Sequence, residues 1–171
     1  MYCYCLFCET QKCQAVVSLI ESKLGCRALY PKQVQHIRKQ GEMMDLERDL
    51  LPGYVFFYAE SASVVFPKDL HINGILKILR NLDGSCELRD EDEQFALMIL
   101  ERQGRIGRTK VYEEGREIQI SKGAFGGARS KILKLDRRNG RMQIEISFAG
   151  QKVRTWVEYE IIASDASGSE L

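Results

Sequence analysis

Residues 122–136 read KGAFGGARSKILKLD, a stretch that decides between two classes of fold. It combines three glycines with four basic side chains, which suits either a loop that binds phosphate or a tight turn between strands. A Walker loop has the form Gly-x-x-x-x-Gly-Lys-Ser/Thr and leads into a helix. Here Gly127 is followed by Ala128 and Arg129, and polar and apolar residues then alternate as in a strand. The stretch therefore predicts a turn between two strands and disfavours a nucleotide-binding loop.

Alternation predicts four short strands around this turn, at residues 117–121, 130–136, 141–148 and 153–159. In the first three strands, the side chains expected to face inward are Ile118, Ile120, Ile132 or Leu133, Leu135, Met142, Ile144, Ile146 and Phe148. The dipeptide Asn139-Gly140 predicts a type I′ turn between the second strand and the third.

The glycine-rich turn itself has a structural role in this interpretation. Gly123, Gly126 and Gly127 would supply backbone with positive φ, and Phe125 would fill one end of the core. Together with the four strands, the turn predicts a small all-β barrel.

The first 104 residues predict a different kind of unit, in which strands and helices mix. Strands are expected at residues 2–8 and 26–34, the latter broken at Pro31. Residues 50–58 predict a turn followed by an apolar, aromatic strand that is central in its sheet. Residues 36–49 are charged and follow neither period, which indicates a loop or a loose hairpin.

Two helices are expected in the same unit. The first covers residues 11–24, is capped by Thr10 and ends at Gly25. The second runs from Asp90 to about residue 104, because Asp90 and Glu93 have the spacing of a capping box. Residues 105–114 lack a clear period and predict a linker, and residues 163–171 predict a flexible tail.

Charge divides the chain in the same way. Residues 1–100 carry 11 Lys and Arg against 14 Asp and Glu, whereas residues 115–162 carry 10 basic residues against 5 acidic ones. An acidic first part and a basic second part indicate two units with different partners. A basic surface on a small barrel suits nucleic-acid phosphate, although such charges also serve merely as a solvated surface.

Several function classes are disfavoured by composition. The chain has no apolar run long enough for a membrane span and no signal-peptide pattern, so the six cysteines are expected to be reduced thiols in a cytoplasmic protein. A metal site at Cys-x-Cys-x-x-Cys is the less favoured alternative. No Gly-x-Ser-x-Gly motif occurs, and His36 and His71 have no neighbour at ligand spacing. We therefore expect no cofactor and no enzymatic activity.

Two motifs together resemble a known family. The segment SKGAFGGARSKILKLD (121–136) looks like the KOW motif of ribosomal proteins and elongation factors, and ERDLLPGYVFFY (47–58) is similar to the Pro-Gly-Tyr-Val element of the NusG family. Their order fits that family over nearly the whole chain. The resemblance implies an α+β fold with an N-terminal sandwich at 1–104, in which helices flank an antiparallel sheet, a linker at 105–114, a KOW barrel at 115–162 and a tail at 163–171.

The resemblance also implies partners. Members of the family bind the clamp helices of the largest RNA polymerase subunit through the N-terminal domain, and suppress pausing and termination. The residues that this implies for polymerase binding are Tyr4, Leu6, Phe7, Leu51, Pro52, Gly53, Tyr54 and Phe56. For a hairpin in the nascent RNA, the expected residues are Lys122, Arg129, Lys131, Lys134, Arg137, Arg138, Arg141, Lys152 and Arg154. A monomer is expected.

Departures from the family pattern favour a specialised paralogue. Tyr2-Cys3 replaces the usual Trp-Tyr, Gly123-Ala124-Phe125 replaces Gly-Pro-Phe, and the tip at 148–156 lacks the usual Phe-Gly-Arg. The chain thus resembles paralogues such as RfaH and LoaP, the latter more closely because the second unit is basic. Two alternatives stay open: a general elongation factor whose KOW domain binds a ribosomal protein or termination factor, and an RNA-processing enzyme with an unrecognised active site.

Overall fold

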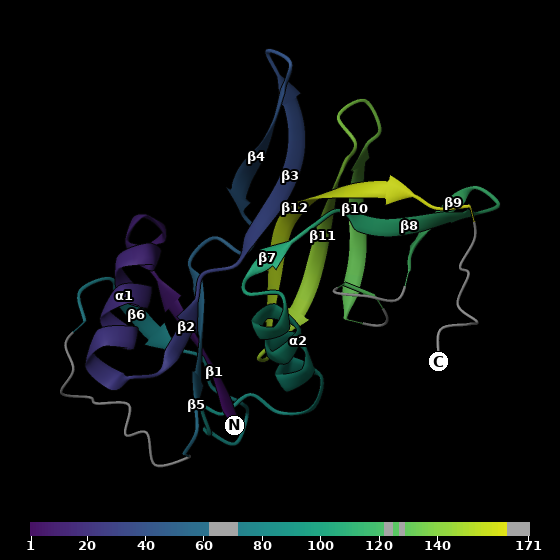
Figure 1. Ribbon diagram of the computed structural model, residues 1–171. Helices are drawn as coiled ribbons and strands as arrows, with labels where there is room; N and C mark the ends of the chain where they lie inside the picture. The colour runs from purple at the N-terminus through teal and green to yellow at the C-terminus, as the bar shows by residue number, and fades with distance from the viewer. Residues whose placement is uncertain (62–71, 122–124, 127–128, 164–171) are drawn as a thin grey trace. The chain divides into compact units, whose positions relative to one another are not determined.

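The computed structural model describes residues 1–61, 72–121, 125–126 and 129–163 (Figure 1). Its helices are the 3₁₀-helix η1 (Thr10–Lys12) and the α-helices α1 (Cys13–Leu24) and α2 (Asp90–Glu101). Its strands are β1 (Tyr2–Cys8), β2 (Arg27–Leu29), β3 (Lys32–Lys39), β4 (Glu42–Asp49), β5 (Tyr54–Ala59), β6 (Ile75–Ile78), β7 (Arg105–Ile106), β8 (Thr109–Glu114), β9 (Glu117–Ile120), β10 (Ser130–Asp136), β11 (Arg141–Phe148) and β12 (Gln151–Ile161). The mixed α and β class is as predicted.

Backbone contacts divide the chain into two compact units. The first contains Met1–Lys32 and Leu51–Ile106, and the second contains Gln33–Leu50 with the residues from Gly107 onward. The hydroxyl of Thr155 in β12 donates a hydrogen bond of 2.6 Å to the carbonyl of Leu50, which ties residues 33–50 to the second unit. The assignment of a function to each unit stays a prediction.

The first unit is built on an antiparallel sheet with the strand order β2-β5-β1-β6. β5 is central and pairs with β1 from Tyr2↔Ala59 to Phe7↔Tyr54. Since alternate side chains of a strand point to opposite faces, Phe57 joins the cluster around α1 while the Phe56 ring lies 6.1 Å from Phe95 of α2. Burial on both faces explains why β5 is apolar throughout, and confirms its predicted central place.

Both predicted helices form, but neither has the predicted N-terminal cap. Gly25 ends α1 with φ +63° and donates its N–H to Glu21, as expected of a left-handed C-terminal glycine. Thr10 lies in η1 and makes no capping hydrogen bond. The capping box of Asp90 and Glu93 was also wrong, because Arg89 occupies the N-cap position and no side chain caps α2. The acids of the first turn instead suit the positive end of the helix dipole.

Residues 36–49, predicted as a loop or loose hairpin, belong to the long hairpin of β3 and β4. The turn residues Gln40 and Gly41 have φ of +53° and +89°, the backbone of a type I′ turn. Most side chains of the hairpin are exposed, including Met43 and Met44 near the turn. Strands whose two faces are both largely exposed to solvent need no alternation of polar and apolar residues. The sequence pattern therefore did not predict these strands.

Residues 105–114 were predicted to be a linker without regular structure, but strands β7 and β8 form there. β8 pairs antiparallel with β9 and parallel with the end of β12, where Tyr159 lies opposite Thr109. The alternation of β8 is confined to Thr109, Lys110 and Val111, too short a pattern to indicate a strand. Its pairing with β9, and with β12 from a distant part of the sequence, stabilises it. β6 was also missed.

The second unit contains a five-stranded sheet with the order β10-β11-β12-β8-β9. The four inward residues predicted for β11 and the ring of Phe125 are buried, as expected. Leu135 was expected to be buried but remains 39% exposed, although its pairing with Met142 places it on the inner face. It lies on β10, an edge strand that has a paired neighbour on one side only in the described sheet. The backbone predicted for Gly123 and Gly127 lies outside the described residues.

The turn between β10 and β11 differs from the predicted type I′ turn. Asp136 pairs with Arg141, so the loop between the strands has four residues. Of the predicted turn residues Asn139 and Gly140, only Gly140 has positive φ. The Asp136 carboxylate accepts hydrogen bonds from the side-chain and backbone N–H of Asn139, which lowers the Asp136 pKa. Hydrogen bonds to the Asp136 side chain thus stabilise this loop, in place of the two-residue type I′ turn that the Asn-Gly pattern predicted.

The edges of this sheet approach each other without pairing among the described residues. β9 and β10 line a cleft of about 440 Å³ through Ile118, Gln119, Ile120, Ser130, Lys131 and Ile132. The predicted barrel is therefore a curled sheet here, with an unpaired seam between its edge strands.

The cysteines lie in the first unit and are free thiols. Cys3, Cys5, Cys8, Cys13 and Cys26 are buried, as expected for packed thiols, and Cys86 is half-buried. Within the described ranges no three His, Cys, Asp or Glu side chains are grouped to hold a metal ion. The helices that the structure describes are too short or too polar to span a membrane.

Candidate functional site

A partly exposed aromatic pair lies on the sheet of the first unit. Phe7 of β1 and Tyr54 of β5 are direct neighbours, with ring centroids 5.1 Å apart. Lys77 of β6 lies opposite Phe7, and its ammonium is 5.8 Å from the Phe7 ring. Pro52 is exposed beside them. We call Phe7, Pro52, Tyr54 and Lys77 the aromatic patch.

Gly53 shapes this patch. Its φ is +90°, and a Cβ on it would lie 2.9 Å from Cε2 of Phe7 and 3.0 Å from the carbonyl oxygen of Cys8. Its own carbonyl accepts the Cys8 N–H at 2.7 Å. Only glycine fits this close approach, so the Pro-Gly turn positions the start of β5 against the end of β1.

The other residues predicted for polymerase binding lie inside the unit. Tyr4 stacks on Phe57 with centroids 4.8 Å apart, and Leu6, Leu51 and Phe56 are almost fully buried. These side chains cannot touch a partner without rearrangement, whereas Phe7, Pro52 and Tyr54 can. The sequence could not separate the two groups, because every residue from 54 to 58 is apolar or aromatic and the uncovered end of the sheet is a tertiary feature.

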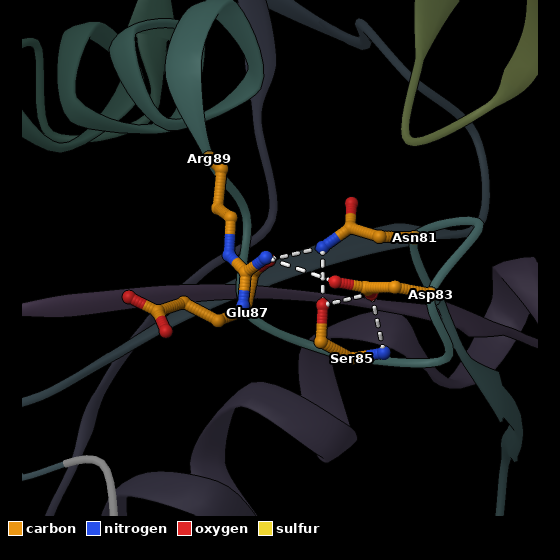
Figure 2. A network of polar contacts seen from close by, with 5 residues as sticks. All are labelled: Asn81, Asp83, Ser85, Glu87 and Arg89. Atoms are coloured by element: carbon orange, nitrogen blue, oxygen red, sulfur yellow. Dashed lines mark hydrogen bonds and ion pairs between the residues drawn. The ribbon is translucent and has the colours of Figure 1, made fainter.

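The loop between β6 and α2 was missed by sequence reasoning, and Figure 2 shows what orders it. Asp83 accepts hydrogen bonds from Ser85 and from Arg89, and the bonds from Ser85 are the main cause of its lowered pKa. Asn81 donates to the Ser85 hydroxyl and to the Glu87 carbonyl. The signal was the run Asn-Leu-Asp-Gly-Ser, which is typical of turns.

Polar side chains cover one face of β10, β11 and β12 in the second unit. Strand pairing places them in rows, since directly opposite residues share a face. Lys131, Glu145 and Arg154 form one row, and Lys134, Gln143 and Trp156 form the next. We define the polar sheet face as Lys131, Lys134, Arg141, Gln143, Glu145, Lys152, Arg154 and Trp156.

Ion pairs neutralise part of the predicted basic surface. Glu145 lies 3.0 Å from Nε of Arg154 and 3.5 Å from Nζ of Lys152, and the hydrogen bond from Arg154 is the first cause of its lowered pKa. Arg137 pairs with Glu113 at 3.1 Å. Three of the nine predicted cations are therefore already engaged. Composition could not show this, because the pairing depends on strand register.

The remaining predicted cations differ in availability. Lys131, Lys134 and Arg138 are exposed and have no acidic partner within the described part of the chain. The guanidinium of Arg141 lies over the Trp156 ring, 5.4 Å from its centroid. Arg129 is half-buried, and Lys122 lies outside the described residues. The strongest unpaired positive charge is thus on β10 and the turn after it.

Comparison with known proteins identifies relatives of this architecture. No family model matches the sequence. The transcription termination/antitermination protein NusG of Streptococcus pyogenes serotypes M1 and M3 is 23% identical over 140 residues, covering 80% of this chain and 76% of the relative. A solved structure described as "Domain interaction in Thermotoga maritima NusG" matches 92% of this chain and 93% of its own, with a TM-score of 0.53 and 14% identity.

The chain is similar to NusG proteins in sequence and shares the fold of a NusG structure. The resemblance drawn from the two motifs is confirmed at this level. The similarity in structure extends over both units and supports the fold. Neither comparison distinguishes a general NusG from a specialised paralogue, so that choice depends on the surfaces of this chain.

Proposed function

We propose that this NusG-family protein is a cytoplasmic, non-enzymatic transcription elongation and antitermination factor. Its first unit binds the clamp helices of RNA polymerase, and its basic second unit binds a hairpin in the nascent transcript. The aromatic patch carries the polymerase half of the proposal. It combines partly exposed aromatic rings with the Gly53 turn that orders them, and apolar surfaces of this kind accept partner helices.

The basic second unit supports RNA as the second partner. Three exposed cations without acidic partners lie on β10 and its turn, close to an exposed tryptophan on the same sheet. A ribosomal protein or termination factor is the alternative partner, as in a general NusG. The unusual excess of basic residues favours RNA.

Replacement of Tyr54 with alanine is expected to weaken binding to a clamp-helix fragment by about tenfold. Aromatic residues dominate many interfaces, and this one is accessible at the patch. The measurement is calorimetric titration of the full-length protein with the fragment. Leu82→Ala is the matched control, since Leu82 is fully exposed in the same unit but outside the patch. Equal affinities of wild type and Tyr54→Ala, with both folded, would refute the patch.

RNA binding by the full-length protein is expected to weaken as salt rises. Three free cations predict a slope of about −2 to −3 in a plot of log association constant against log salt, at roughly 0.7–0.9 per neutralised phosphate. Alanine at Lys131, Lys134 and Arg138 together should remove most of this slope. Glu145→Gln should tighten binding, because it releases Lys152 and Arg154 from their ion pairs.

The control for this experiment is Lys23→Ala, an exposed cation on α1 of the first unit, which should leave the slope unchanged. A filter-binding series from 50 to 300 mM salt is suitable. Binding of a ribosomal protein with no detectable RNA affinity at low salt would support the alternative function instead.

A further inference from the structure

An exposed tryptophan interrupts the polar sheet face. Trp156 is the chain's only tryptophan and remains 37% exposed. Its neighbours Thr155 and Val157 point inward and are buried, so alternation directs the indole to the outer side. A residue that could bury large apolar area elsewhere instead presents part of its surface to solvent among charged side chains. Such a placement indicates a binding role.

The guanidinium of Arg141 packs over this indole and adds a positive charge to the aromatic surface. The guanidinium lies 5.4 Å from the ring centroid, within the range of a cation–π interaction. The two acids opposite Arg141 in the sheet are Asp136 and Glu158. Both have other partners, although the charge of Arg141 also helps to lower the Asp136 pKa. Asp136 accepts two hydrogen bonds from Asn139, and Glu158 lies 3.7 Å from Arg108.

The surroundings supply the other contacts that a nucleotide needs. Gln143 lies directly opposite Trp156, and its amide can both donate to and accept from the edge of a base. Lys134 lies opposite Gln143 and is exposed, in reach of a phosphate next to that base. An apolar protein segment would desolvate these charges without offering them a polar partner. An anionic, aromatic group such as a nucleotide matches both the aromatic surface and the positive charge.

We propose that Trp156 and Arg141 form a stacking site for one unpaired base of an RNA, with Lys134 holding the adjoining phosphate. This inference rests on the proposed RNA function and specifies where it recognises its ligand. A base paired within a duplex cannot stack on the indole, but a bulged base can leave the helix and do so. The site therefore selects RNA with an extruded base over plain duplex.

The test uses the full-length protein and two hairpins that differ by one bulged adenosine. The bulged hairpin is expected to quench the Trp156 fluorescence and to bind at least tenfold more tightly than the plain hairpin. Trp156→Ala should abolish this preference, so that the bulged hairpin binds no more tightly than the plain one. Trp156→Phe should retain part of the preference, because phenylalanine keeps an aromatic face.

A third hairpin, with an abasic nucleotide in the bulge, retains the phosphate and removes the base. Its affinity for the wild type should fall to the level of the plain hairpin, and Trp156→Ala should weaken it no further. If Trp156→Ala weakens all three hairpins equally, or if the bulge preference survives the substitution, the stacking site is overturned while RNA binding stands. If no hairpin binds at low salt, both the site and the RNA function are overturned.

Discussion

Phe56→Ala is expected to lower the free energy of unfolding by about 4 kcal/mol. The side chain is fully buried, and its ring lies against Phe95 between the sheet and α2. Removal of the ring leaves a cavity that the central strand cannot close, since β1 and β2 fix β5 on both sides. Urea denaturation followed by circular dichroism at neutral pH measures the change.

The matched variant is Tyr54→Ala, two residues away on the same face of β5. Tyr54 is only half-buried, so its loss should cost about 1–2 kcal/mol while it weakens polymerase binding. The pair separates a core role from a contact role. If Phe56→Ala kept full stability but lost polymerase binding, Phe56 would be a contact residue and the burial argument would be wrong.

The protein is also expected to lose stability steeply above pH 9. Burial raises the pKa of the Cys3 thiol to about 11 and that of Cys8 to about 12, and it raises the pKa of Cys5 well above its ordinary value of 9.0. The unfolded chain releases these protons near pH 9, but the folded chain does not. Stability is therefore complete below pH 9 and is lost progressively as pH rises toward 11 and 12.

Each such thiol contributes a decrease of about 1.4 kcal/mol per pH unit in this window, so three thiols give roughly 4 kcal/mol per unit. Urea midpoints measured with reductant at pH 8, 9, 10 and 11 test the slope. Cys8→Ala should remove about one third of it, although Tyr58, whose pKa is also raised by burial, adds a contribution above pH 10. An unchanged slope in Cys8→Ala would contradict the assignment.

The buried thiols have a consequence at neutral pH. A thiol whose pKa is raised stays protonated, and the protonated form is a poor nucleophile. The clustered cysteines near the N-terminus thus act as small apolar side chains in the core. Their spacing resembled a ligand pattern in the sequence, but β1 directs Cys3 and Cys5 to one face and Cys8 to the other.

The proposed RNA-binding role depends on the second unit. The balance between ion-paired cations, such as Lys152 and Arg154, and unpaired ones, such as Lys134, determines how much charge RNA encounters. A factor that reads an extruded base needs both a stacking surface and nearby free cations. The polar sheet face has both, which accords with the proposed hairpin-binding function.

Local pattern in the sequence was sufficient wherever one face of an element meets the core and the other meets water. Met142, Ile144 and Ile146 alternate with polar residues, and that contrast identifies β11 and its inner face. The apolar stripe of α1 and the glycine after it identify that helix in the same way. Two sequence motifs, the Pro52-Gly53 turn before an apolar strand and the glycine-rich turn at residues 122–136, were together enough to indicate a resemblance to the NusG family.

Only the tertiary structure decided features in which that contrast is absent or the partners are distant. Strand β4 is largely exposed on both faces and β5 is buried on both, so neither alternates. Strand β8 forms because β12, distant in sequence, pairs with it. The same reason applies to the candidate sites. The packing of α2 determines which apolar residues of β1 and β5 remain at the surface. Glu145 neutralises Arg154 because the strand register places the two residues opposite each other. Periodicity reports only the average contrast between core and water along one element, whereas contacts between elements depend on pairing across long stretches of chain.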